Sequence, residues 1–156
     1  MVGRNIFEHT GAQDVEIVSP TSRELNLLDR GAVRHFLSKE MPDLIIHCAG
    51  RVGGIQANMA DPVGFLGDNV DMGLNVISSA ASVGIKNLIN LGSSCMYPRE
   101  TSNPLNENLI LQGELEPTNE GYALAKIVAT RLCEYIVRED TTKNYKTLIP
   151  CNLYGR

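Results

Sequence analysis

Tyr122 and Lys126 stand four residues apart in a segment whose apolar spacing predicts a helix over residues 122–137. On a helix, positions i and i+4 share one face, so the phenol hydroxyl and the ammonium can reach a common pocket. Bringing a phenol pKa from about 10 to about 7 takes about 4 kcal/mol, which a cation about 4 Å away supplies at an effective dielectric of about 20. Such a pair suits protonation of a carbonyl oxygen while a nicotinamide delivers a hydride. The alternative is an exposed lysine one turn from a packed tyrosine.

A serine pair follows the predicted strand 87–91, in the segment Gly92-Ser93-Ser94. Ligands of doubly wound sheets bind at the carboxyl ends of the strands. A serine hydroxyl at this place can hydrogen-bond the carbonyl oxygen that Tyr122 would protonate. Ser93 and Ser94 are both candidates, and the sequence does not separate them.

Short apolar runs alternate with helical patterns along the chain. Strands are predicted over 15–18, 43–48, 87–91 and 146–149, and helices over 29–40, 62–83 and 122–137. This alternation predicts an α/β fold, a doubly wound parallel sheet of Rossmann type. We expect one domain over residues 1–156, because this length favours a single core.

The chain opens inside a predicted first helix, Met1 to about Thr10. A dinucleotide-binding unit begins one strand earlier, with a glycine-rich turn that leads into this helix. Gly3 can be the last glycine of that turn. The preceding strand would be central, between strands 15–18 and 43–48, and losing it forfeits about 12 kcal/mol of apolar burial. We therefore expect an incomplete Rossmann domain, truncated at its start.

The composition of the chain excludes several classes of function. The 156 residues are 43% hydrophobic and 21% charged, as in ordinary globular domains. A net charge of −4 provides no basic stripe for nucleic acid, and no apolar run approaches the roughly 20 residues that span a membrane. The four cysteines lack zinc spacing, so no metal is expected. Without a secretory signal we expect reduced thiols and a cytoplasmic location.

A narrower resemblance covers nearly the whole chain. Five blocks carry it: Glu24–Asp29, Arg51–Ile55, Leu91–Pro98, Glu116–Lys126 and Asn152–Gly155. They resemble the GDP-L-fucose synthase family, in the extended branch of the short-chain dehydrogenase/reductases. The resemblance implies an NADPH-dependent epimerase/reductase that converts GDP-4-keto-6-deoxy-D-mannose to GDP-L-fucose.

The resemblance also implies catalytic roles. Ser93 and Tyr122 would hold and protonate the C4 oxygen, and Lys126 would tune Tyr122 and bind the nicotinamide ribose. Cys95 would be the acid/base for epimerisation beside the C4 ketone, a task that fits a thiol pKa lowered from about 8.5 toward neutral. The alternative for Cys95 is a buried, inert thiol.

The expected cofactor is NADP(H). The cofactor-binding residues implied are Gly3, Arg23, Asn26, Leu27, Ala49, Gly50, Tyr122, Lys126, Asn152 and Leu153. No acidic residue directly follows Val18 to bind a free ribose 2′-hydroxyl, which favours NADP. Arg23 is the candidate for the 2′-phosphate. Its alternative is an ordinary solvated arginine.

Two departures from the family pattern suggest a fragment with little activity alone. The family's second epimerisation residue is a histidine downstream of the Asn152 block, whereas His9, His35 and His47 all lie upstream. The chain also stops at Arg156, before the region expected to bind the GDP-sugar. Another sugar-nucleotide epimerase or dehydratase, or a non-catalytic nucleotide-binding remnant, stays an alternative. The apolar faces of helices 62–83 and 125–137 are expected first to pack on the sheet, and the resemblance implies that the same helices pair as the homodimer interface of the intact protein.

Overall fold

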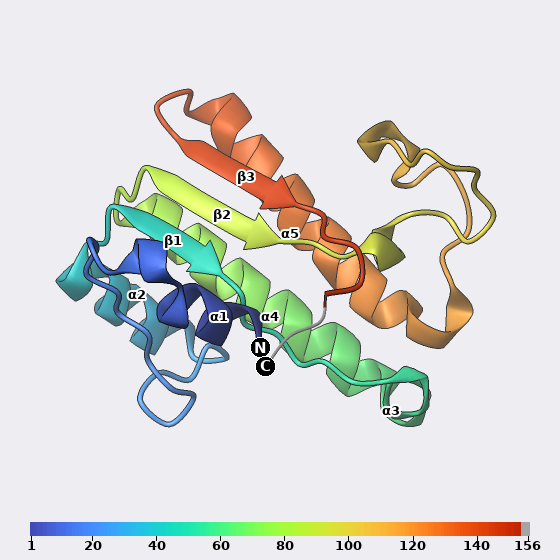
Figure 1. The fold of residues 1–156 in the computed structure, drawn as a ribbon, viewed down its shortest axis with the longest axis horizontal. Coiled ribbons are helices and arrows are strands. Elements are labelled where there is room, and N and C mark those ends of the chain that lie inside the picture. The colour runs from blue at the N-terminus through green and yellow to red at the C-terminus, as the bar shows by residue number, and fades with distance from the viewer. Residues whose placement is uncertain (154–156) are drawn as a thin grey trace.

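Three parallel strands form the sheet. The structure is a computed structural model and describes residues 1–153 (Figure 1). The strands are β1 (Leu44–His47), β2 (Asn87–Leu91) and β3 (Asn144–Leu148), in the order β1-β2-β3. Leu44 lies opposite Asn87, and Asn87 lies opposite Asn144. All three carboxyl ends therefore meet at one edge of the sheet.

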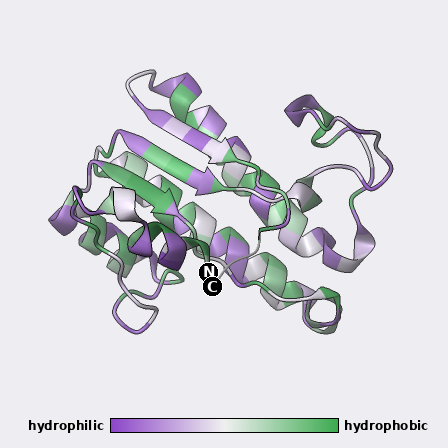
Figure 2. Cartoon of the chain, in the orientation of Figure 1, coloured by the Kyte–Doolittle hydropathy of each residue, from purple (hydrophilic) through white to green (hydrophobic). Residues whose placement is uncertain are grey.

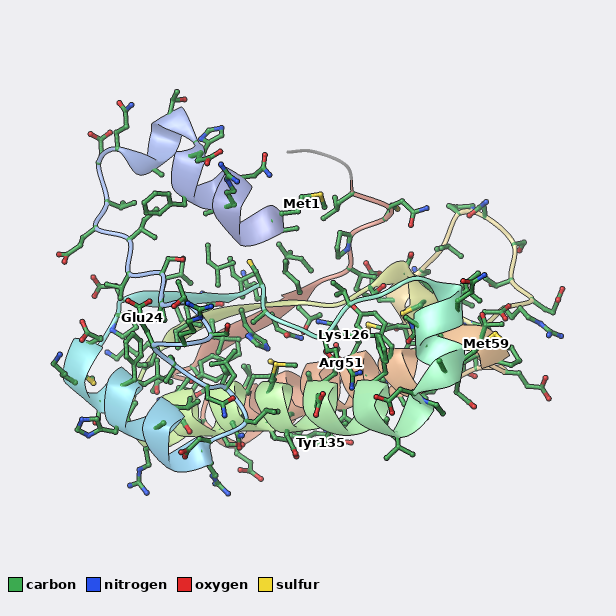
Figure 3. The ribbon with its side chains drawn as sticks, turned by 90° about the horizontal axis from the view of Figure 1, so that it is seen from below. Met1, Glu24, Arg51, Met59, Lys126 and Tyr135 are labelled. Carbon is green, nitrogen blue, oxygen red and sulfur yellow. The ribbon has the colours of Figure 1, made fainter. Side chains whose placement is uncertain are left out.

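Helices lie on both faces of this sheet. Figure 3 shows α2 (Arg30–Glu40), α4 (Pro62–Ser82) and α5 (Glu120–Glu139) on one face and α1 (Val2–Glu8) on the other. One short helix, α3 (Ile55–Ala60), precedes α4. The 3-10 turns are η1 (Thr10–Ala12), η2 (Ser94–Met96), η3 (Glu107–Leu109) and η4 (Pro117–Asn119). The arrangement is an α/β, Rossmann-type fold in partial form, which confirms the predicted fold class.

Local chemistry explains the helix ends. The Asp29 carboxylate accepts from the Ala32 N–H at 3.0 Å and begins α2, and Asp61 does the same for Gly64 at the start of α4. Gly84 follows α4 with φ of 90°, the left-handed backbone that glycine adopts without strain.

The main core lies between β2 and the three-helix layer. Leu88 of β2 is completely buried, and Ile77 of α4, Val33 of α2 and Cys133 of α5 pack in the same cluster. Figure 2 shows the apolar colour concentrated on β1 and the middle of β2. None of the helices within residues 1–153 combines the length and apolarity that crossing a membrane requires.

The predicted strand over 15–18 is wrong. This segment is extended but unpaired, and Val15 and Val18 are 60% and 50% exposed. A strand forms only beside another backbone, and none of the strands within residues 1–153 pairs with this segment. The other prediction errors are small: β3 begins at Asn144, α5 begins at Glu120, and α3, too short for a periodic pattern, was not predicted.

Candidate active site

Lys126 lies buried at the carboxyl end of β2. It is only 8% exposed because α5 packs against the sheet, and its Nζ donates to the Leu91 carbonyl at 2.9 Å. Burial lowers the pKa of the Lys126 ammonium, while the negative charge of the Cys95 and Cys48 thiolates opposes that change. A buried cation at the edge where strands present their carboxyl ends is suited to binding and polarising a ligand.

Tyr122 lies one helical turn before Lys126, as predicted. The Lys126 Nζ lies 5.6 Å from the centroid of the Tyr122 ring. Burial raises the pKa of the Tyr122 phenol, and the charge of Cys95 raises it further. The lowering expected from Lys126 is therefore not found in this structure, because burial of the phenol disfavours its charged form.

Ser93 and Cys95 occupy the turn that follows β2. The Ser93 Oγ accepts from the Cys95 N–H at 3.4 Å as η2 begins. Burial raises the pKa of the Cys95 thiol, and the smaller effects of the Ser93 hydrogen bond and the Lys126 charge lower it. The pKa change thus has the opposite sign to the one expected for Cys95. Its cause is desolvation in the half-buried turn.

The four predicted catalytic residues are brought together. Cys95 interacts electrostatically with both Tyr122 and Lys126, and Ser93 hydrogen-bonds the Cys95 backbone. Two hydroxyls, one thiol and one ammonium therefore surround one end of β2. This set can donate a proton to a carbonyl oxygen and exchange protons at the adjacent carbons.

Asn69 was missed by sequence reasoning and holds the neighbouring loop. Its Oδ1 accepts from the Arg51 N–H at 2.9 Å, and its Nδ2 donates to the carbonyls of Arg51 and Phe65 at 3.0 and 2.7 Å. A Cβ on Gly50 would come within 3.0 Å of the Asn69 Oδ1 and 3.8 Å of the Lys126 Nζ. The sequence does contain a signal that could have identified Asn69: it is a polar residue four positions after Phe65, on the buried face of a predicted helix.

His47 is a second residue that was missed. It ends β1, is 6% exposed, and its pKa is lowered to about 4 by burial and by the Lys126 charge. An unfolded histidine titrates near 6.5, so the unfolded chain binds more protons between these values. Stability is therefore complete above about 6.5 and is lost as pH falls toward 4.

We expect the free energy of unfolding in urea to fall by up to about 3 kcal/mol over this pH range because of His47. His47→Leu should flatten that slope relative to the unmodified chain, and His35→Gln, at an exposed histidine, should not. An unchanged slope in His47→Leu would contradict the assignment.

The expected cofactor residues fall into three groups. Ala49 and Gly50 follow β1, and Gly3 lies near them, because a Cβ on Gly3 would meet the Cys48 Cβ at 3.8 Å. Asn152 and Leu153 are exposed just beyond β3, while Tyr154 and Gly155 of the same block lie outside the described residues.

Arg23, Asn26 and Leu27 form the third group, in the loop before α2. Arg23 and Asn26 are exposed, and the Leu27 carbonyl accepts from the Asn75 Nδ2 of α4 at 2.9 Å. The contacts within residues 1–153 do not connect this loop to Tyr122 or Lys126.

Comparisons with known proteins show similarity along the whole chain. A model described as "NAD dependent epimerase/dehydratase family" matches residues 1–156. GDP-L-colitose synthase of Yersinia pseudotuberculosis is 54% identical over 156 residues, 100% of this chain and 51% of that protein. GDP-L-fucose synthase of Azorhizobium caulinodans is 51% identical over 155 residues, 99% of this chain and 49% of that protein.

A solved structure is similar in fold as well. The GDP-L-fucose synthetase of Naegleria fowleri bound to NADP is 30% identical with a TM-score of 0.81, covering 88% of this chain and 42% of that chain. The chain spans about half the length of the curated relatives named above.

Proposed function

Because the chain belongs to the NAD-dependent epimerase/dehydratase family, we propose that it carries the reducing site of an NADPH-dependent GDP-4-keto-6-deoxyhexose epimerase/reductase. The proposed product is GDP-L-fucose. The observation that supports this most is the buried Lys126, bonded to the end of β2 beside Tyr122, Ser93 and Cys95. About half of a relative's length is represented, so activity is assigned to the protein that contains this chain.

In the proposed reduction, Tyr122 donates its proton to the C4 oxygen of the sugar. Its raised pKa keeps the phenol protonated at neutral pH, and the buried Lys126 ammonium, 5.6 Å from the ring centroid, is the cation nearest to the phenolate that would remain. Ser93 is the candidate that holds the same oxygen by a hydrogen bond, with Ser94 as the alternative. NADPH, when bound, supplies the hydride.

In the proposed epimerisation, Cys95 exchanges protons at the carbons beside the C4 ketone. The ketone makes those C–H bonds acidic, and the thiol lies within electrostatic reach of Tyr122 and Lys126. Cys95 would exchange the proton on one face of each carbon, and inversion would need the second acid/base that the resemblance implies, acting on the opposite face.

The residues present fit a dinucleotide. Gly50 leaves space beside Lys126 that a side chain would fill, and it lies at the carboxyl edge where such cofactors run. Gly3, Ala49, Asn152 and Leu153 would line the same edge. The loop with Arg23, Asn26 and Leu27 would hold the adenosine end, with Arg23 at the 2′-phosphate.

We expect Arg23→Ala to weaken NADPH binding about tenfold while leaving NADH binding unchanged, because only NADPH carries the 2′-phosphate. Fluorescence titration of both cofactors measures this difference. The exposed Arg34→Ala is a matched control that should change neither affinity. An equal loss for NADPH and NADH would contradict the role of Arg23.

The function is tested by mixing the protein that contains this chain with NADPH and GDP-4-keto-6-deoxymannose. Loss of NADPH absorbance with formation of a GDP-6-deoxyhexose is the expected result. Binding of NADPH without oxidation would favour the alternative, a nucleotide-binding remnant. The similarity to a GDP-L-colitose synthase makes a 3,6-dideoxy product the second candidate.

Exposed apolar side chains on α4 and α5 support homodimerisation of the intact protein. Val63 and Leu66 of α4 are 81% and 36% exposed, and Val128 and Tyr135 of α5 are 40% and 52% exposed. Pairing of these helices would bury these side chains.

All four cysteines are free, in keeping with the proposed cytoplasmic location.

A further inference from the structure

The loop that follows β1 covers residues 48–54 and has no regular secondary structure. Within residues 1–153, the hydrogen bonds of its middle part, residues 49–52, are all made by Arg51. The backbone of Arg51 bonds to the Asn69 amide of α4, and its side chain reaches the start of the same helix. The position of this loop therefore depends on Arg51.

The Arg51 guanidinium is held on three sides. Its Nη2 lies 2.8 Å from the Asp61 Oδ2, its Nη1 lies 3.1 Å from the Asp68 Oδ2, and its Cζ lies 4.6 Å from the centroid of the Phe65 ring. Figure 3 shows Arg51 beside α4. The planar fork of a guanidinium can serve two carboxylates and stack on a ring at once, whereas a lysine ammonium is a single point charge.

Gly64, in the first turn of α4, leaves the room that this guanidinium occupies. A Cβ on Gly64 would collide with the Arg51 Nη1 and with the Asp61 carboxylate. The positive end of the helix dipole disfavours a cation at this place, so the carboxylates of Asp61 and Asp68 are needed to hold it. One exposed ion pair contributes little, but two pairs, a ring contact and two backbone hydrogen bonds act together on Arg51.

Gly50, the residue before Arg51, lies where the cofactor is proposed to run. A Cβ on Gly50 would come within 3.0 Å of the Asn69 Oδ1 and 3.8 Å of the Lys126 Nζ, so little space separates this backbone from the site. A displacement of the loop by about 1 Å would change that space while leaving Lys126 and Tyr122 in place on α5.

We propose that Arg51 is a positioning residue for the nicotinamide cofactor: paired with Asp61 and Asp68, it holds the loop after β1 so that the cofactor fits beside Gly50. This inference rests on the proposed function, which assigns the space beside Gly50 to the cofactor. Arg51 acts through the loop, and its own cation is already paired at the start of α4. Its effect is therefore the same for NADPH and NADH, in contrast to the effect of Arg23 at the 2′-phosphate.

The test measures the dissociation constants of NADPH and NADH by fluorescence titration, without sugar, in the protein that contains this chain. Arg51→Gln should weaken the binding of both cofactors equally, by about tenfold. In turnover, KM for NADPH should rise while kcat stays near that of the unmodified protein, because the reacting groups keep their places. A variant that is only less folded would lose kcat at an unchanged KM.

Arg131→Gln is the matched control. The Arg131 side chain is 39% exposed, as is that of Arg51, and it pairs with Glu134 at 2.6 Å on α5. This variant should change neither dissociation constant. Hydrogen exchange of peptides that cover residues 48–54, measured without cofactor, should be faster in Arg51→Gln and unchanged in Arg131→Gln.

Asp68→Asn separates positioning from direct contact with the cofactor. It keeps the shape of the side chain but removes the charge that holds the Arg51 Nη1, so both cofactors should bind more weakly. The double variant, Arg51→Gln with Asp68→Asn, should be no weaker than Arg51→Gln alone. If Arg51 instead bound the cofactor diphosphate, its release from Asp68 would strengthen binding. Asp61 is unsuitable for this test because its carboxylate also caps α4.

The outcomes separate the two proposals. Unchanged dissociation constants in Arg51→Gln, a loss for NADPH alone, or tighter binding in Asp68→Asn overturns the positioning role and leaves the proposed function standing. An unmodified protein that binds neither cofactor overturns the proposed function, and this inference with it. Melting temperatures identify a variant that fails to fold, and Asp68→Asn decides the question if Arg51→Gln is such a variant.

Discussion

Tyr122→Phe is expected to lower kcat for sugar-dependent NADPH oxidation by about 10²–10⁴-fold. The substitution removes only the hydroxyl, so the ring stays in place beside Lys126, whose Nζ lies 5.6 Å from its centroid. The C4 oxygen then gains negative charge without receiving a proton. Stopped-flow or steady-state absorbance of NADPH with GDP-4-keto-6-deoxymannose measures the loss.

Cofactor binding distinguishes a chemical effect of Tyr122→Phe from a structural one. NADPH affinity should change little, because the Lys126 Nζ keeps its hydrogen bond to the Leu91 carbonyl. Tyr135→Phe is a matched control: Tyr135 lies on the same helix, is 52% exposed, and should lose no activity. Turnover by Tyr122→Phe equal to that of the unmodified protein would remove Tyr122 from the acid role.

Cys95→Ser is expected to abolish exchange of solvent deuterium into the keto sugar, with a loss of about 10²–10⁴-fold. A serine hydroxyl occupies nearly the same space but does not ionise in the range where a thiol does. Mass spectrometry of the sugar, incubated in D₂O without NADPH, follows the exchange separately from reduction.

The direction of the pKa change at Cys95 predicts how deuterium exchange depends on pH. Burial raises the pKa of the Cys95 thiol above its ordinary value, so the thiolate fraction is small at neutral pH and grows as the pH rises. Exchange by the unmodified protein should therefore keep rising above about pH 8.5, where an ordinary thiol is half ionised. Cys133→Ser changes a buried thiol of α5 outside the site and should leave exchange intact. If the Cys95→Ser variant still exchanges deuterium, Cys95 is an inert thiol and not the acid/base of epimerisation.

The helices and buried strands were predictable because their signals are local. The apolar spacing of α2 and α4 and the unbroken apolar run of β1 appear in consecutive residues. The segment 15–18 has the same kind of signal, yet a strand also needs a partner backbone, and that requirement is not local. Sequence patterns therefore predicted which segments are extended but not which ones pair.

Residue types and spacing were enough to identify the candidate chemical groups: Tyr122 and Lys126 one turn apart, and the serine pair and Cys95 after one strand. The electrostatics of these groups depend on the tertiary structure. Burial of Tyr122, Cys95 and Lys126 governs the direction of their pKa changes, and burial depends on residues distant in the chain. Asn58 and Asn119 likewise line one hollow because α3 and η4 pack together, although the two residues are far apart in the sequence. Spacing fixes which atoms are available, whereas packing sets the dielectric and the neighbours that determine what those atoms can do.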